Sequence, residues 1–226
     1  MNWTSRNWPH VLELTGAHLL QSVLPLLLGA LIAIPVARLA ARSRTLRPVL
    51  VTGSSLLYTI PSLTLFVVLP LLLGTQITSV LNVVVALTVY VVAILVRSSV
   101  DAFESVDRDV LQASTALGYR PLRRFLGVEL PLAVPVLVAG LRVASVSNIS
   151  MVSVGAVIGV QSLGTLFTDG LRRSILEEIV VGIALTVLLA VLLDLVLRGT
   201  GHALTRWQRA GGARPPVPRV RRGAVA

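Results

Sequence analysis

The sequence predicts an all-α polytopic membrane protein with about five transmembrane helices. Of its 226 residues, 54% are hydrophobic and only 13% are charged, and the mean hydropathy is +0.85. No Asp, Glu, Lys or Arg occurs between Arg47 and Arg97. As one helix this stretch would be roughly 70 Å long, more than twice the ~30 Å hydrocarbon core of a bilayer. It therefore predicts two spans joined by a short turn.

Five apolar segments are long enough to cross a membrane, and they lie near residues 17–39, 49–73, 79–97, 132–158 and 177–198. The fourth span contains Arg142, and the fifth contains Asp194 near its end. A charge inside a span costs about 2.5–3.5 kcal/mol on insertion scales, so we expect both side chains to face protein, water or the interface. Arg142 is either a functional charge or a structural arginine that reaches towards the interface.

The arginines predict the topology. Most of them lie between spans one and two, between spans three and four, and after span five, whereas the opposite side has only Arg6, Arg172 and Arg173. The positive-inside rule then places the N-terminus outside and the C-terminus in the cytoplasm. Residues 1–16 form an extracytoplasmic segment, and residues 17–200 form the membrane domain. We expect the cytoplasmic tail, residues 201–226, to be disordered, because its Gly, Pro and Arg residues cannot build a core.

The missing residue types exclude several classes of protein. All 20 basic residues are arginine, so the chain has neither a P-loop lysine for nucleotide phosphates nor an amine for Schiff-base chemistry. It has no cysteine, and His10, His18 and His202 have no second ligand at metal spacing. We therefore predict no metal, cofactor or catalytic residue, and energy for any driven process would come from another polypeptide. Arginines beside membrane spans explain the net charge of +10 without nucleic acid.

The longest cytoplasmic segment, residues 98–131, predicts two short helices. A weakly apolar stripe runs along the first helix through Val110, Ala113, Ser114 and Leu117. Gly118 stands where a helix ends in a left-handed residue. Pro121 suits the first turn of a second helix, with Leu122, Phe125 and Leu126 along one side. Such an exposed element is suited to docking into a groove on a partner.

The same segment resembles the loop signature of ABC importer permeases. Residues 112–131, QASTALGYRPLRRFLGVELP, match the spacing of EAA, three residues, Gly, nine residues and I-x-L-P, with the departures Gln112 for Glu, Ser114 for Ala and Val128 for Ile. The resemblance implies the type I importer (MetI-like) fold, in which this loop is a coupling helix that inserts into a separate ATPase subunit. It implies docking through Gln112, Ala113, Ser114, Leu117, Gly118, Tyr119, Arg120, Pro121 and Arg123.

A second segment interrupts span two with polar residues and a proline. Pro61 removes a backbone hydrogen bond, and nearby hydroxyls can satisfy the loosened backbone groups. This pattern predicts the lining of a translocation pathway by Tyr58, Thr59, Pro61, Ser62 and Thr64. The alternative is an ordinary proline kink where helices pack.

Residues 58–66, YTIPSLTLF, are similar to a segment of glycine betaine, carnitine and choline permeases. Residues 158–166, IGVQSLGTL, are similar to the stretch between the last two spans of the same group, except at 160–162. Gly155, Gly159 and Gly164 are expected to permit a close approach or a turn near the outer surface.

Together these resemblances cover about residues 15–200 and imply the permease subunit of a bacterial importer for a small osmolyte. The implied partners are an ATPase subunit, a second permease copy or paralogue, an extracytoplasmic binding protein and membrane lipid. Two alternatives stay open, a permease for another small solute such as an amino acid and a stand-alone secondary transporter. The second alternative needs intramembrane acids for ion coupling, and Asp194 is the only acid well inside a predicted span.

Overall fold

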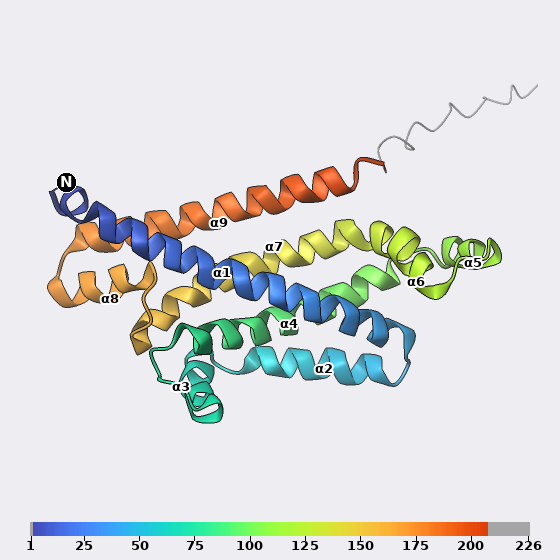
Figure 1. Ribbon diagram of the computed structural model, residues 1–226, viewed down its shortest axis with the longest axis horizontal. Coiled ribbons are helices and arrows are strands. Elements are labelled where there is room, and N and C mark those ends of the chain that lie inside the picture. Colours follow the sequence, from blue (N-terminus) through green and yellow to red (C-terminus); the bar gives the residue numbers. More distant parts are fainter. Residues whose placement is uncertain (1, 208–226) are drawn as a thin grey trace, which may run out of the picture.

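The computed structural model describes residues 2–207, and it confirms the all-α prediction because no β-strand occurs among them. Long helices run side by side, with short helices at both ends and along one side (Figure 1). In chain order the helices are α1 (Asn2–Arg42), α2 (Leu46–Thr59), α3 (Ser62–Leu73), α4 (Val80–Glu104), α5 (Arg108–Ala116), α6 (Pro121–Arg124), the π-helical turn η1 (Phe125–Glu129), α7 (Leu130–Val154), the 3-10 turn η2 (Gly155–Ile158), α8 (Gly164–Arg173) and α9 (Leu176–Leu204).

Four of the described helices are long and apolar enough to cross a membrane. They are α1, α4, the continuous helix Pro121–Ile158 and α9, and the bent pair of α2 and α3 makes a fifth if it counts as one span. The prediction of about five spans is therefore in agreement with the structure. The second span, however, is not a single kinked helix, because α2 and α3 meet at an angle of 99°.

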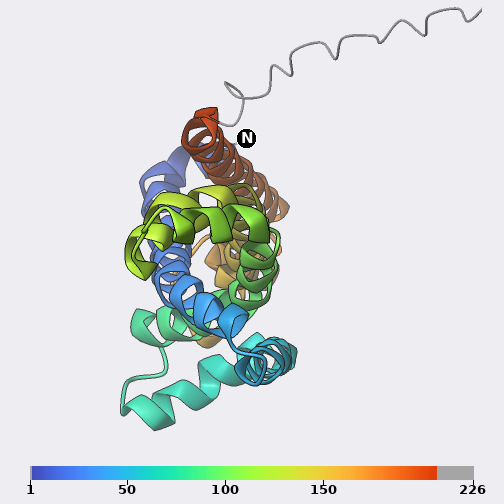
Figure 2. The ribbon, with the colours of Figure 1, turned by 90° about the vertical axis from the view of Figure 1, so that its right-hand side faces the viewer.

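Helix α4 lies at the centre of the molecule. In its 18-residue apolar stretch 56% of the residues are buried, against 6% in the corresponding stretch of α9. Its neighbour α1 presents small residues to it, and Ala33, Ala37 and Ala40 are fully buried. Small side chains let two helix backbones approach closely, which is the usual basis of helix association in membranes. Viewed from the end that carries α5 and α6, the α2–α3 pair flanks this centre on one side and α9 flanks it on another (Figure 2).

Helix α1 begins well before the predicted start of the first span. It is continuous from Asn2 and contains Pro9, Pro25 and Pro35. Its first turns are held by tertiary contacts, since Leu14 packs against the cluster of α8 and α9. The hydroxyl of Thr4 also donates a 2.8 Å hydrogen bond to Glu177 of α9. The polar composition of residues 1–16 concealed this helical extension.

Two other predicted boundaries differ from the structure. The predicted cytoplasmic segment, residues 98–131, overlaps the helices of the spans on both sides. Helix α4 continues to Glu104, and the helix of the fourth span already begins at Pro121. The tail does not begin at residue 201, because α9 continues to Leu204. Residues 208–226, which make up most of the predicted tail, lie outside the described residues.

Candidate functional site

The predicted docking element, residues 108–124, projects from one end of the molecule, where α5 and α6 lie (Figure 1). The carboxylate of Asp107 caps α5 by accepting the backbone N–H of Asp109 at 2.8 Å. The turn between the helices depends on Gly118, whose φ is +80°. A Cβ there would meet nothing within 4 Å, so glycine is required by the backbone conformation and not by space. Pro121 occupies the first turn of α6, as the sequence predicts.

Most of the predicted docking residues face outwards. Leu117 is 77% exposed, and the exposed set also contains Gln112, Ala113, Gly118, Arg120, Pro121 and Arg123, with Tyr119 half-buried. Ser114 does not belong to this surface, because it is buried and its hydroxyl donates to the Leu111 carbonyl at 2.8 Å. On the second helix Leu122 and Leu126 are exposed, whereas Phe125 turns inwards. The element therefore presents an apolar ridge with basic flanks.

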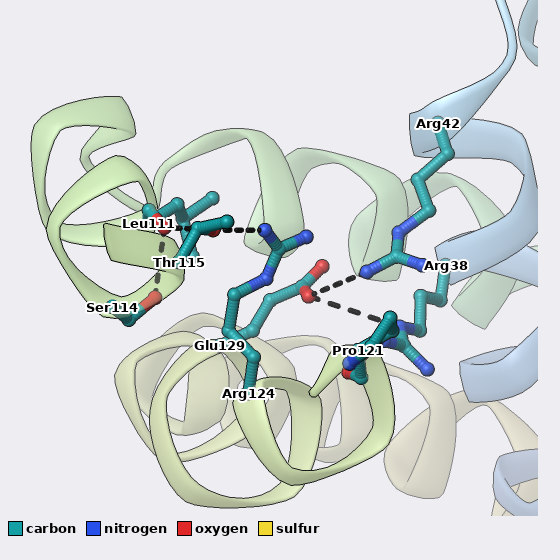
Figure 3. A network of polar contacts seen from close by, with 8 residues as sticks. All are labelled: Arg38, Arg42, Leu111, Ser114, Thr115, Pro121, Arg124 and Glu129. Atoms are coloured by element: carbon teal, nitrogen blue, oxygen red, sulfur yellow. Dashed lines mark hydrogen bonds and ion pairs between the residues drawn. The ribbon is translucent and has the colours of Figure 1, made fainter. Parts of the chain in front are cut away.

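A buried carboxylate anchors this element to the first span. Glu129 is 5% exposed, and its Oε2 accepts a hydrogen bond from Arg42 Nη2 at 3.3 Å and lies 3.8 Å from Arg38 Nε (Figure 3). Both arginines lie in the last turns of α1. The ion pairs thus join the start of α7 to the end of α1.

Arg38 makes two further contacts with the docking element. It donates a 3.1 Å hydrogen bond to the Pro121 carbonyl, and its guanidinium lies 3.6 Å from the ring centroid of Phe125. Within the element, Arg124 donates to the Thr115 hydroxyl at 2.7 Å, which links α6 to α5 (Figure 3). These contacts make α5, α6 and the end of α1 one connected unit.

The second helix of the docking element is continuous with the fourth span. Between them the backbone forms a π-helical turn, in which the N–H of Leu130 donates to the carbonyl of Phe125. Such turns inside α-helices are frequently found at functional sites. Because the helix is not interrupted, a displacement of α6 passes directly to α7.

The sequence analysis did not identify Arg38, Arg42 or Glu129 as site residues. The available signal was Glu129 itself, a single acid within the apolar run FLGVELPLAV. A lone charge in such a run calls for a partner, but its partner lies 87 residues earlier in the chain. Only the packing of α1 against α7 brings the two together.

The second predicted site lies where the chain bends between α2 and α3. Pro61 precedes α3 with an extended backbone, so the proline ends one helix and begins another instead of kinking a single helix. The hydroxyl of Tyr90 in α4 donates a hydrogen bond to the carbonyl of Ile60 at this break. The Tyr90 ring meets that of Tyr58 edge-on, with 6.0 Å between ring centroids.

The predicted pathway residues do not enclose a channel within one chain. Tyr58, Thr59, Pro61 and Thr64 are exposed, and Ser62 is half-buried. The Thr59 hydroxyl satisfies a backbone carbonyl of its own helix, that of Leu56, at 2.7 Å. These side chains therefore form part of an outer face of the molecule.

Two of the glycines between the last two spans make the turn and the close approach that the sequence predicts. Gly159 has a φ of +88° and reverses the chain after η2. A Cβ on Gly164 would lie 2.2 Å from the backbone oxygen of Ser153, so the start of α8 packs directly on the backbone of α7.

The two intramembrane charges pair with each other. Arg142 of α7 makes two contacts with the Asp194 carboxylate of α9, at 2.5 and 3.2 Å. Arg198, one turn further along α9, reaches the same carboxylate at 2.8 Å. Arg142 therefore pairs with Asp194, and the one acid well inside a predicted span is engaged by two arginines.

Polar residues of α1 and of the C-terminal half of α7 form a second group that was not predicted from the sequence. The amide of Asn148 donates to the Ser22 carbonyl at 2.6 Å, and His18 Nε2 lies 3.1 Å from the Ile149 carbonyl. All of these side chains are buried. They tie α1 to α7 in the interior of the helix bundle. No group of three potential metal ligands occurs among the described residues.

Comparison with known proteins gives a consistent set of relatives. Residues 26–209 match the family model described as the binding-protein-dependent transport system inner membrane component. The chain is 33% identical over 202 residues to the osmoprotectant import permease protein OsmW of Salmonella typhimurium, which covers 88% of this chain and 94% of that protein. It is 31% identical to the glycine betaine/carnitine/choline transport system permease protein OpuCD of Bacillus subtilis, over 92% of this chain and 90% of that protein.

Two further matches extend this picture. The ergothioneine transport permease/ergothioneine binding protein EgtU of Helicobacter pylori is 33% identical over 77% of this chain, which corresponds to 30% of that longer protein. Among solved structures, a chain of the MetNI methionine ABC transporter in an inward-facing conformation has a TM-score of 0.71 at 20% identity and covers 87% of this chain and 95% of that one. This likeness shows the shared fold.

Proposed function

Because the chain belongs to the family of binding-protein-dependent transport system inner membrane components, we propose that it is the permease of an ABC importer that carries glycine betaine, choline or carnitine. The observation that carries the proposal is an exposed docking element that is continuous with a membrane span. The chain lacks the P-loop lysine of an ATPase site, so a separate subunit supplies the hydrolysis of ATP.

The docking surface for that ATPase subunit is the ridge around Gly118. Leu117 and Leu122 provide exposed apolar side chains on either side of the turn, and Arg120 and Arg123 provide charge at its flank. An apolar ridge with a basic rim suits insertion into a groove with an acidic edge. Gln112 and Ala113 extend the surface along α5.

Transport proceeds by alternating access between two permease chains. The pathway residues around Pro61 lie on the outer face of one chain, so a second copy or a paralogue is needed to enclose the solute. Closure of the ATPase pair moves α5 and α6, and the continuous helix carries this movement into α7.

An extracytoplasmic binding protein supplies most of the selectivity. A quaternary ammonium is normally held by an aromatic cage, and near the bend this chain offers Tyr58 and Tyr90. The relative that carries permease and binding protein in one chain supports this division of labour.

The docking end faces the cytoplasm and the N-terminus lies outside. The arginine-rich connections at the ends of α1 and α4 support this orientation.

Co-purification with candidate ATPase subunits tests the proposal, using two variants of Gly118. Gly118→Asn keeps the left-handed turn, because asparagine tolerates that conformation, and should keep the complex. Gly118→Val forces the backbone out of it, and the ATPase subunit should then be lost. If the wild type formed a complex with none of the ATPase subunits tested, the proposal would be refuted in favour of a stand-alone transporter.

A further inference from the structure

A cleft of about 800 Å³ lies between the end of α1, the start of α2 and the last turns of α4. It is distinct from the docking ridge, which lies around Gly118 at the far end of α5. Five arginines and two acids line the cleft and give it a net charge of +3. These residues are Arg42, Arg44, Arg47, Arg97, Arg108, Asp101 and Glu104.

Three of these arginines have no partner. Arg47 pairs with Glu104 at 2.7 Å, and Arg42 is engaged by Glu129. Within residues 2–207, no hydrogen bond or ion pair neutralises the side chains of Arg44, Arg97 and Arg108. Asp101 also lines the cleft and makes no ion pair among the described residues, so these four side chains leave a charge of +2 that would favour a bound anion.

The length of α4 favours a position of the cleft near the lipid headgroups. Helix α4 begins at Val80, and Arg97 follows roughly 26 Å later at ~1.5 Å per residue, close to the edge of a ~30 Å hydrocarbon core. Beside the cleft, Leu46 and Val49 of α2 are 47% and 64% exposed. The positive groups are therefore next to an apolar surface that suits acyl chains.

We propose that this cleft binds the phosphate headgroup of an anionic phospholipid. A guanidinium matches two phosphate oxygens with two parallel N–H donors, and arginine is preferred wherever phosphate is bound in this way. A free phosphate would satisfy the same arginines but would leave the adjacent apolar surface of α2 unused. The inference uses the proposed orientation only to place the lipid in the cytoplasmic leaflet.

The bound headgroup would stabilise the docking element. Arg44 belongs to the α1–α2 connection, Arg97 to α4 and Arg108 to the first turn of α5. A phosphate bound by all three joins these segments at the base of the docking element. This site therefore complements Glu129, which anchors the other end of the element to α1.

The test is a titration of the purified chain, alone in detergent, with phosphatidylglycerol and with phosphatidylcholine of the same acyl chains, followed by native mass spectrometry. The wild type should bind phosphatidylglycerol at least about tenfold more tightly. The triple variant Arg44→Gln/Arg97→Gln/Arg108→Gln should lose at least about tenfold of that affinity. The matched variant Arg6→Gln/Arg172→Gln/Arg206→Gln removes the same charge from exposed positions elsewhere and should keep it.

A triple lysine variant at positions 44, 97 and 108 retains the charge but not the paired N–H donors, so its affinity should lie between those of the wild type and the triple glutamine variant. Equal affinity of the wild type for the two lipids would overturn the proposal, and so would equal losses in the two glutamine variants. Displacement of phosphatidylglycerol by an equal concentration of inorganic phosphate would identify a free-anion site and overturn the lipid assignment. Because no ATPase subunit is present, a negative result here leaves the transport function untouched, and a failed co-purification leaves this result standing.

Discussion

Glu129 accepts a 3.3 Å hydrogen bond from Arg42, 87 residues earlier in the chain, and so joins the start of α7 to the end of α1. The π-helical turn that ends at Glu129 connects the docking element to α7. A movement of the docking element is therefore transmitted to two spans at once, to α7 through the backbone and to α1 through the ion pair.

Replacing Glu129 by Ala should uncouple the docking element from α1. The loss should be smaller than the about 3–5 kcal/mol of a fully buried pair, because Arg42 is 41% exposed and only Arg38, at 15%, is left largely buried without an acid. We expect substrate-stimulated ATP hydrolysis to fall roughly tenfold in proteoliposomes, while the ATPase subunit still co-purifies.

The matched control for that variant is Glu104→Ala. Glu104 also pairs with an arginine, Arg47, but the two side chains are 38% and 50% exposed. Exposed pairs contribute only about 0–1 kcal/mol, so hydrolysis should change less than about twofold. Equal effects of the two variants would contradict a special role for Glu129.

The pair between α7 and α9 should respond unequally to removal of its partners. Asp194→Asn leaves both Arg142 and Arg198 without a carboxylate, and an unpaired charge in a span costs up to about 3 kcal/mol. Arg142→Gln should cost less, because Asp194 keeps Arg198 at 2.8 Å. Thermal unfolding in detergent should rank the variants in this order.

The double variant Arg142→Gln/Asp194→Asn completes a double-mutant cycle that measures the coupling energy of this pair. It should be more stable than Asp194→Asn alone, because the intramembrane charge at position 142 is gone. A double variant whose loss equals the sum of the two single losses would show that the contact contributes no coupling energy.

The close crossing of α1 and α4 depends on Gly29. A Cβ at this position would lie 2.3 Å from Cγ1 of Val91, so Gly29→Ala should destabilise the protein by about 1–3 kcal/mol. Adding Val91→Ala removes Cγ1 but leaves the Cβ of residue 91 at 2.7 Å, so it should recover only a small part of the loss. Gly16→Ala is the control in the same helix, because nothing lies within 4 Å of its added Cβ. Retention of full thermal stability by Gly29→Ala would contradict this packing.

The orientation of the chain can be measured directly because the sequence contains no cysteine. Thr45, between α1 and α2, and Ser174, between α8 and α9, are both exposed. In intact cells a membrane-impermeant maleimide should label Ser174→Cys, and it should label Thr45→Cys only after permeabilisation. The cysteine-free wild type provides the blank, and the opposite labelling pattern would reverse the proposed topology.

Several features of this protein were determined by the sequence alone, because they depend on local chemistry. The uncharged stretch between Arg47 and Arg97 already requires membrane spans. Gly118 and Pro121 mark the end of one helix and the beginning of the next, and the backbone follows both. These signals are readable because each depends on one residue and its immediate neighbours.

Other features were decided only by the tertiary structure. The pairing of Glu129 with Arg42 and that of Arg142 with Asp194 join residues far apart in the chain, and sequence periodicity carries no information about which charges will meet. Pro61 likewise indicates an interruption, but the size of the bend depends on how α2 and α3 pack against α4. The polar start of α1 is contacted by Glu177 of α9 through Thr4, and further along Leu14 packs against Leu163 and Leu166. In each case the deciding free energy comes from contacts between helices, which exist only once the helices have assembled.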